Sequence, residues 1–265
     1  MARFLVVPQW QGSPSARAML LIDGASAIAG DLPRAATSML DAPVEAGDSL
    51  GTGVRRVSSL QQVRSLVAKE MSPETIVIGG DCSVSVAALD AIDRDDLAVV
   101  WCDAHPDLHT PESSPSGAFS GMALRAILGE GEPQLVLSPP VSRARTVVVG
   151  ARAIDDDEND ALAGLTRLGV DDLADVNALA DAVAATGARR VWVHIDVDVL
   201  DPAELSAVSE AAPFGTTAAA LSAAVRALRE RVPLAGATIA GFAPRSPIDA
   251  VDDLGTILRL VAAVA

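Results

Sequence analysis

The sequence contains no tyrosine, and aromatic residues together make up 3% of its 265 positions. Such a composition argues against an aromatic recognition surface and favours helices packed on a sheet through small side chains. Only two cysteines are present, Cys82 and Cys102, which excludes a disulfide framework. No apolar stretch reaches the roughly 18 residues that a membrane-spanning helix needs, so we expect no membrane partner.

Positive charge is also scarce. The chain carries 20 Lys and Arg against 35 Asp and Glu, for a formal net charge of −15. Proteins that bind nucleic acid normally carry a basic face, so we expect no nucleic-acid partner. The chain begins with a strand-like segment, Arg3 to Val7, in place of the basic and apolar regions of a signal peptide. The expected compartment is therefore the cytoplasm.

Short β-branched runs alternate with Ala- and Leu-rich helical stretches along the whole chain. Apolar strands separated by helices are typical of a parallel sheet covered on both faces, so the predicted class is α/β. Since no repeat or low-complexity linker interrupts the pattern, we predict a single domain over residues 1–265. The expected strands are Phe4–Val7, Thr75–Ile78, Ala98–Trp101, Thr146–Val149, Val191–Ile195 and Thr238–Phe242. The expected helices are Ala16–Ile28, Ser59–Lys69, Val84–Ile92, Gly121–Leu128, Asp157–Leu165, Leu173–Thr186, Thr217–Arg229 and Asp252–Val264.

Three acidic motifs follow predicted strands. They are GGDCS at 79–83, DAHPD at 103–107 and HIDVD at 194–198. In open α/β sheets, ligands bind beyond the carboxyl ends of the strands. Three polar motifs at such ends therefore indicate a functional site at that edge of the sheet.

The spacing within the motifs points to a metal site. Residues two apart in a strand project to the same side, so Asp196 and Asp198 are expected to present two carboxylates in one direction. Asp103, His105 and Asp107 repeat this spacing around one imidazole. A single acidic pair can equally be a helix cap or an ion-pair partner. Two such motifs, each closing an apolar strand, favour divalent cations that neutralise the repulsion between buried carboxylates.

The donor types suggest which metal and which reaction. Four carboxylates and one imidazole form an oxygen-rich site that suits manganese better than zinc or copper. Two ions about 3.5–4 Å apart share a water that becomes hydroxide near neutral pH. The sequence thus predicts a two-metal hydrolase.

GGDCS, DAHPD and HIDVDVLDP, in this order and at this spacing, resemble the signatures of the arginase and agmatinase (ureohydrolase) family, from about Ile76 to Pro244. The resemblance implies a three-layer α/β/α fold with a central, mostly parallel sheet of about eight strands. It also implies two manganese ions and attack of metal-bound hydroxide on a guanidino carbon. Because relatives assemble as trimers or hexamers, a homo-oligomer is among the expectations.

The resemblance implies roles for individual residues. Asp107 would also accept a hydrogen bond from the bridging hydroxide. One ion would be held by Cys82, Asp103, Asp107 and Asp196, and the other by Asp103, His105, Asp196 and Asp198.

Four further matches bear on the substrate. Asp155 and Glu158 fall on positions that hold the α-amino group of arginine in the family, although acidic residues also favour the first turn of a helix. Ser116 and His109 fall on positions near the α-carboxylate. These matches imply a guanidino amino acid as the small-molecule partner, in preference to agmatine, which lacks the carboxylate.

Three residues depart from the family pattern. Cys82 replaces a metal-binding histidine, Ser120 replaces a histidine thought to shuttle protons, and Gly241 replaces a glutamate that grips the guanidinium. A thiol binds metal only as thiolate and is a soft donor, so Cys82 is expected to weaken its ion or leave an open position. Asp107 and Ser120 are the expected catalytic positions.

Together the departures favour a substrate less basic than arginine. An N-hydroxyguanidine fits, and the cysteine is similar to that of the hydroxyarginine hydrolases of D-cycloserine biosynthesis. The leading hypothesis is therefore hydrolysis of Nω-hydroxy-L-arginine to hydroxyurea and ornithine. The alternatives are an arginase or other guanidino-acid hydrolase, and a weakened family member that only binds. Glu210 is a spare carboxylate that could face the guanidino group, or simply a loop residue facing solvent.

Overall fold

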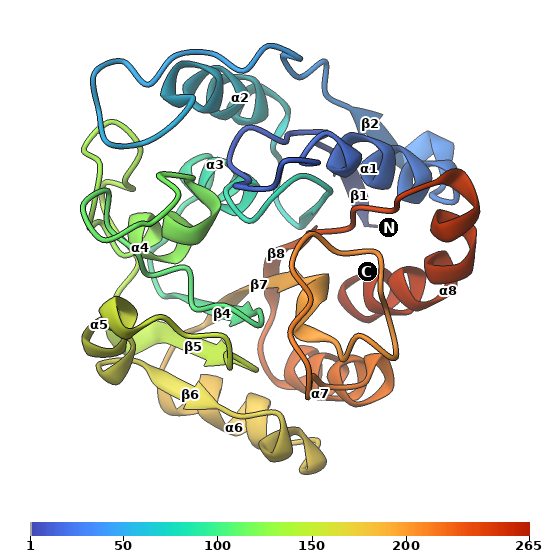
Figure 1. Ribbon diagram of the computed structural model, residues 1–265. Coiled ribbons are helices and arrows are strands. Elements are labelled where there is room, and N and C mark those ends of the chain that lie inside the picture. Colours follow the sequence, from blue (N-terminus) through green and yellow to red (C-terminus); the bar gives the residue numbers. More distant parts are fainter. Residues whose placement is uncertain (1) are drawn as a thin grey trace.

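The computed structural model describes residues 2–265, and its strands form one parallel sheet (Figure 1). The strand order is β2-β1-β3-β8-β7-β4-β5-β6, with eight strands among the described residues. Buried β-branched runs explain the central strands, and every residue of β4 is buried. The strands are β1 (Arg3–Val6), β2 (Thr37–Met39), β3 (Thr75–Ile78), β4 (Leu97–Cys102), β5 (Thr146–Val149), β6 (Thr166–Leu168), β7 (Arg190–Asp196) and β8 (Leu234–Ala240).

Helices cover both faces of the sheet. One face is covered by α1 (Leu20–Gly30), α6 (Ala178–Ala185), α7 (Ala218–Arg231) and α8 (Pro247–Val264). The other face is covered by α2 (Val57–Glu70), α3 (Val84–Asp90), α4 (Ala123–Ile127) and α5 (Asn159–Ala163). Each face buries its own apolar cluster against the sheet. The predicted three-layer α/β/α fold is confirmed.

Several predicted boundaries were wrong. The predicted helix 173–186 is a 3-10 turn, Asp171–Ala174, followed by the shorter α6. Helix α8 begins five residues earlier than predicted, because Ser246 caps it by accepting from the amide of Asp249 and Pro247 occupies its first turn. Strand β8 ends at Ala240, so Gly241 lies just beyond it.

The strand order determines where the acidic motifs meet. Although β8 comes late in the chain, it pairs with both β3 and β7, and β7 pairs in turn with β4. The carboxyl ends of these four strands therefore lie side by side at the centre of the sheet. Within residues 2–265, no helix is long and apolar enough to cross a membrane.

Candidate active site

A cavity of about 580 Å³ opens where the carboxyl ends of β3, β8, β7 and β4 meet. Its walls come from the loops after these strands, which include residues 114–116 and 208–210, and from segments after β1 and β5. Every site residue expected from the sequence lines this cavity except Asp103. Asp103 is 1% exposed and lies directly beside His105. The fold thus gathers all the candidate residues at one location.

The first cluster consists of Asp103, His105 and Asp198. The Nδ1 of His105 lies 3.4 Å from Asp103 Oδ1 and 3.1 Å from Asp198 Oδ2. The amide of His105 donates to Asp103 Oδ1 at 2.7 Å, and the amide of Ala104 donates to Asp198 Oδ1 at 3.0 Å. One donor atom from each of the three residues lies within 4.8 Å of the others, close enough to hold a single ion.

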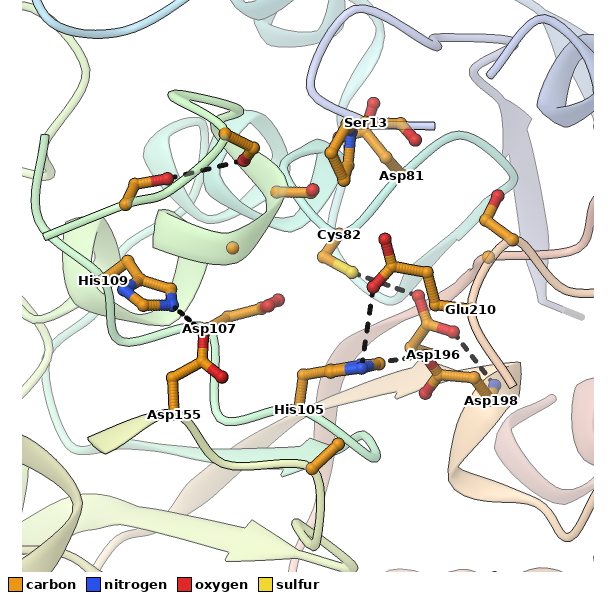
Figure 2. Close-up of a pocket in the computed structure, with 18 of the residues that line it drawn as sticks. Ser13, Asp81, Cys82, His105, Asp107, His109, Asp155, Asp196, Asp198 and Glu210 are labelled. Atoms are coloured by element: carbon orange, nitrogen blue, oxygen red, sulfur yellow. Dashed lines mark hydrogen bonds and ion pairs between the residues drawn. The ribbon is translucent and has the colours of Figure 1, made fainter. Parts of the chain in front are cut away.

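The second cluster is centred on Cys82, which follows β3 at the start of α3. Its Sγ lies 3.0 Å from Asp196 Oδ2 and 3.7 Å from Asp103 Oδ2. Figure 2 shows the thiol directed at the Asp196 carboxylate. Asp103 therefore contacts both clusters.

Asp107 lies between these clusters and the outer part of the cavity (Figure 2). The residue is buried, its backbone has a φ of +53°, and its Oδ2 has no hydrogen-bond partner in residues 2–265. A left-handed conformation is costly for a non-glycine residue, so its retention here is consistent with a functional constraint. A buried carboxylate oxygen without a donor is suited to a cation or to a proton from a ligand.

Charge in the metal-free site is unbalanced. Burial, together with the nearby Asp198 and Asp103, raises the pKa of Asp196 well above its ordinary value. Burial and the charge of Asp103 raise the pKa of Asp107 likewise, and that of Asp198 to about 6. Burial opposes charge on His105, but the carboxylates of Asp103 and Asp198 outweigh it and raise the pKa of His105 to about 12. Burial also opposes charge on Asp103, but His105 and His194 outweigh it and lower the pKa of that carboxyl. Asp107, Asp196 and Asp198 thus hold protons that divalent cations would displace, so the donor set fits metal ions.

Alternation along a strand does not explain how the acidic residues converge. Strand β4 ends at Cys102, so Asp103 to Asp107 lie in a loop rather than at alternating strand positions. Asp196 ends β7, and Asp198 lies in the 3-10 turn Val197–Val199, where its amide donates to Asp196 Oδ1 at 3.0 Å. The predicted strand geometry was wrong because strand pairing does not extend through the acidic motifs, and a loop and a 3-10 turn aim the carboxylates into the cavity.

A polar cluster lies farther out in the cavity. The Nε2 of His109 contacts Asp155 Oδ2 at 3.1 Å and lies 3.8 Å from Glu158 Oε2. Both oxygens of Glu158 also accept from backbone amides, of Leu108 at 2.8 Å and of Asp155 at 3.2 Å, in a capping box. Asp155 and Glu158 are therefore structural caps as well as cavity residues, and the Asp155 side chain is the more accessible of the two, at 64% exposed. Ser116 Oγ accepts from the amide of Ala118 at 3.1 Å.

The remaining candidates surround the metal clusters. Ser120 is buried and lines the cavity. Glu210 is half exposed, and its Oε2 lies 3.8 Å from the Nε2 of His105 (Figure 2). Gly241 has a φ of +85°, and a Cβ there would overlap the carboxylate of Asp196. The absence of a side chain at position 241 therefore allows the Asp196 carboxylate to occupy this space.

The model of the arginase family matches residues 28–258. The chain belongs to the arginase family. Arginase of Staphylococcus aureus (strain COL) is 34% identical over 170 residues, which cover 57% of this chain and 56% of that protein, so the alignment spans little more than half of that relative. Arginase of Bacillus caldovelox is 31% identical over 206 residues, covering 71% and 67%. N(omega)-hydroxy-L-arginine amidinohydrolase of Streptomyces lavendulae is 33% identical over 197 residues, covering 71% and 68%.

Solved structures share the fold. An arginase of Entamoeba histolytica in complex with L-ornithine superposes with a TM-score of 0.85 at 20% identity, over 99% of this chain and 97% of that one. Proclavaminate amidino hydrolase of Streptomyces clavuligerus gives 0.72 at 21% identity, over 99% and 91%. The family resemblance of the three motifs is confirmed.

This arginase-family chain also places two residues at the site that the sequence patterns did not single out. Arg152 lines the cavity and donates to the carbonyls of Asp198, Ala212 and Pro213 at 2.8–2.9 Å. His194 is fully buried beside Asp103, with its Nε2 3.8 Å from Asp103 Oδ2. His194 stands two residues before Asp196, and this strand spacing was the available signal.

Proposed function

We propose that the chain is an amidinohydrolase with two divalent metal ions that converts Nω-hydroxy-L-arginine and water to hydroxyurea and ornithine. The observation that carries the proposal is the convergence of four buried carboxylates and His105 at the base of a cavity of about 580 Å³. The family and the hydroxyarginine relative in Streptomyces lavendulae support the reaction class.

The ions would be held by the residues that converge at the cavity base. Asp103, His105, Asp198 and Asp196 would hold one ion, for which the oxygen-rich donors favour manganese. Asp103, Asp196, Asp107 and Cys82 would hold the other. When bound, the ions supply the positive charge that activates water for attack on the guanidino carbon.

The chain's own residues orient the substrate. The exposed carboxylate of Asp155, beside His109, is placed to accept the α-ammonium group, with Ser116 nearby for the α-carboxylate. This leaves the guanidino end facing the metal clusters. The buried Oδ2 of Asp107, which lacks a partner among the described residues, is placed to accept the proton of the attacking water.

The bond changes define what the site must accomplish. Water oxygen bonds to the guanidino carbon, the bond from that carbon to the ornithine nitrogen breaks, and that nitrogen takes a proton. The hydroxyl of the substrate lowers its basicity, so a site without a glutamate at 241 and without an imidazole at 120 is adequate. Ser120, which lines the cavity, is smaller than the histidine it replaces and leaves room there for the added hydroxyl group.

A direct comparison of substrates tests the proposal. Purified, metal-loaded protein is offered Nω-hydroxy-L-arginine, L-arginine and agmatine, and ornithine or putrescine is measured. We expect kcat/KM for hydroxyarginine to exceed that for arginine by at least about tenfold, or 1.4 kcal/mol of transition-state stabilisation. Comparable rates with both amino acids would favour arginase activity. Two of the three sequence relatives named above are arginases. An absence of product from all three compounds would exclude an amidinohydrolase.

The variant Asp107→Asn tests the role given to the carboxylate of Asp107. Loss of the carboxylate removes the proton acceptor, so we expect kcat to fall by about 10²–10⁴-fold with little change in folding. Retention of full activity in this variant would contradict the role given to Asp107.

A further inference from the structure

His194 is fully buried at the core of the site, and only one of its two ring nitrogens has a hydrogen-bond partner among the described residues. It lies on β7, two residues before Asp196 and on the same side of the sheet. Its Nδ1 shares a 2.8 Å hydrogen bond with Ser85 Oγ of α3, and its ring stacks on Trp101 of β4 with centroids 3.7 Å apart. Its Nε2 has no hydrogen-bond partner in the part of the chain that the structure describes. Buried imidazole nitrogens are normally paired, so this one points to a ligand.

The free nitrogen faces the cysteine cluster. A His194 ring nitrogen, Cys82 Sγ and an Asp103 oxygen lie within 4.8 Å of one another, and all three residues are buried. The separations are 3.8 Å from His194 Nε2 to Asp103 Oδ2 and 3.7 Å from Cys82 Sγ to the same oxygen. Ligands bound about 2.0–2.3 Å from one tetrahedral ion lie roughly 3.3–3.8 Å apart. The cluster therefore has the dimensions of a metal site.

We propose that His194 Nε2 is a ligand of the ion on the Cys82 side, so that this ion is bound by sulfur, nitrogen and oxygen together. The proposal rests on the metal centre of the proposed function but not on its substrate. Ser85 Oγ can accept a proton from Nδ1, and in that tautomer the Nε2 lone pair is available to the ion.

The two sides of the centre then differ in metal preference. Asp103, His105 and Asp198 offer carboxylates and one imidazole, which suit manganese. Cys82 and His194 add a thiolate and a second imidazole, which favour zinc, cobalt or ferrous iron over manganese. The preference for zinc over manganese should therefore be larger beside Cys82 than beside His105, where carboxylate oxygens narrow it.

Metal binding to the full chain tests the proposal without a substrate. Metal-free protein is dialysed against equimolar Mn²⁺ and Zn²⁺, and both metals are counted by mass spectrometry. In parallel, Co²⁺ is titrated while the thiolate charge-transfer and d–d absorption bands are recorded. The variants are His194→Gln, which keeps a polar side chain of similar size, and Ser85→Ala. The control is Cys102→Ala, which removes the other buried thiol, from the opposite face of the sheet.

The wild type and Cys102→Ala should bind a first equivalent of zinc equally tightly, in preference to manganese, and give the same cobalt bands. His194→Gln should lose about 100-fold or more in affinity for that zinc, keep the manganese affinity of the His105 side when Mn²⁺ is the only metal, and show altered d–d bands. Ser85→Ala should lose about tenfold, as expected for a residue that orients a ligand. Unchanged zinc affinity in His194→Gln would overturn the proposal. So would a weakened site with unchanged cobalt bands, since His194 would then only orient Asp103.

A wild-type measurement covers the case in which His194→Gln does not fold. Crystals of the protein grown with Zn²⁺ should show anomalous density about 2.0–2.1 Å from His194 Nε2. Zinc density bound to Cys82 but more than about 3 Å from that nitrogen would overturn the assignment. Neither result depends on which guanidino compound the enzyme hydrolyses.

Discussion

The thiol of Cys82 is poorly suited to hold manganese. Burial, together with Asp107, Asp196 and Asp103, raises its pKa well above the ordinary value, so the thiolate forms only when a cation compensates. Sulfur is also a soft donor for a hard ion. The identity of residue 82 should therefore control both affinity and selectivity.

Cys82→His should raise affinity for Mn²⁺ by about tenfold or more, because a neutral imidazole needs less desolvation of charge and is a harder donor. The variant should also release some ornithine from arginine. Isothermal titration with Mn²⁺ and the ratio of kcat/KM for the two amino acids measure these effects. Cys82→Ser, which removes sulfur without adding nitrogen, should bind Mn²⁺ no better than wild type. Unchanged selectivity in Cys82→His would contradict this account of position 82.

Gly241→Ala tests the space beside Asp196. A left-handed backbone costs any residue with a Cβ about 1–2 kcal/mol, and here the Cβ would also displace the Asp196 carboxylate. We expect lower stability in thermal unfolding and at least about tenfold weaker metal binding. Gly187→Ala is the matched control, because Gly187 has a φ of +70° with open space around it. Gly187→Ala should lose stability but keep its metal affinity. Equal metal affinity in the two variants would contradict the overlap between a Cβ at position 241 and the Asp196 carboxylate.

Among the secondary elements, the loop after β7 depends on one side chain from the loop after β5. The guanidinium of Arg152 donates to the carbonyls of Asp198 and Leu200 near β7 and of Ala212 and Pro213 farther along. It thereby holds residues 201–215, which carry Glu210, over the cavity.

Arg152→Met should destabilise the protein by about 2–4 kcal/mol, because buried carbonyls lose a charged donor. It should also raise KM more than it lowers kcat, since the loop bearing Glu210 loosens. Thermal unfolding and hydrogen exchange in residues 201–215 measure the two effects. Arg190→Met is the control, because Arg190 donates to the carbonyls of Asp93 and Asp95 at the opposite end of the sheet. Equal hydrogen-exchange rates of residues 201–215 in both variants would contradict the proposal that Arg152 holds this loop in place.

The sequence predicted the central elements but missed those at the edges. Strands β3, β4, β5 and β7 can be recognised in the sequence because they are short, continuous runs of apolar residues. Strands β2 and β6 are three residues long, lie at the two edges and are largely exposed, so they leave no apolar signal. Their strand character comes from pairing with β1 and β5, which a local pattern does not contain.

The sequence likewise predicted some residues of the candidate site and missed others. Its acidic members stood out because carboxylates are rare next to buried strands. His194 and Arg152 did not, because His194 lies inside a predicted strand and Arg152 belongs to none of the three acidic motifs. Their roles depend on neighbours such as Ser85 and Ala212 that are distant in sequence. Contacts of this kind follow from strand order, which requires the whole fold.

At the scale of the whole molecule, folding and metal binding are linked through pH. The pKa of Asp198 is raised to about 6 by burial and by Asp103, so the metal-free fold loses stability as pH rises from about 4 to 6. The pKa of His105 is raised to about 12, so its stabilisation is full below about pH 6.5 and declines above that value. Both groups therefore make the metal-free protein less stable as pH rises.

Bound cations replace these protons, so the metal-dependent gain in stability should grow with pH. With one proton displaced per ion, affinity changes about tenfold per pH unit, which corresponds to roughly 2–5 °C in Tm. Tm is measured with and without saturating Mn²⁺ at pH 5, 6, 7 and 8, where we expect a steady increase in the difference. A difference that is constant or shrinks with pH would contradict the proton displacement.

The position of β8 also affects the order in which the sheet and the candidate metal site can assemble during synthesis of the chain. The ribosome makes all six candidate metal-binding residues of the sequence analysis before β8, yet β8 separates β3 from β7 in the finished sheet. Cys82 is held at the end of β3 and Asp196 at the end of β7, so neither can take its final place until residues 234–240 are inserted between them. Metal binding that uses residues of both strands is therefore expected only after residues 234–240 have joined the sheet.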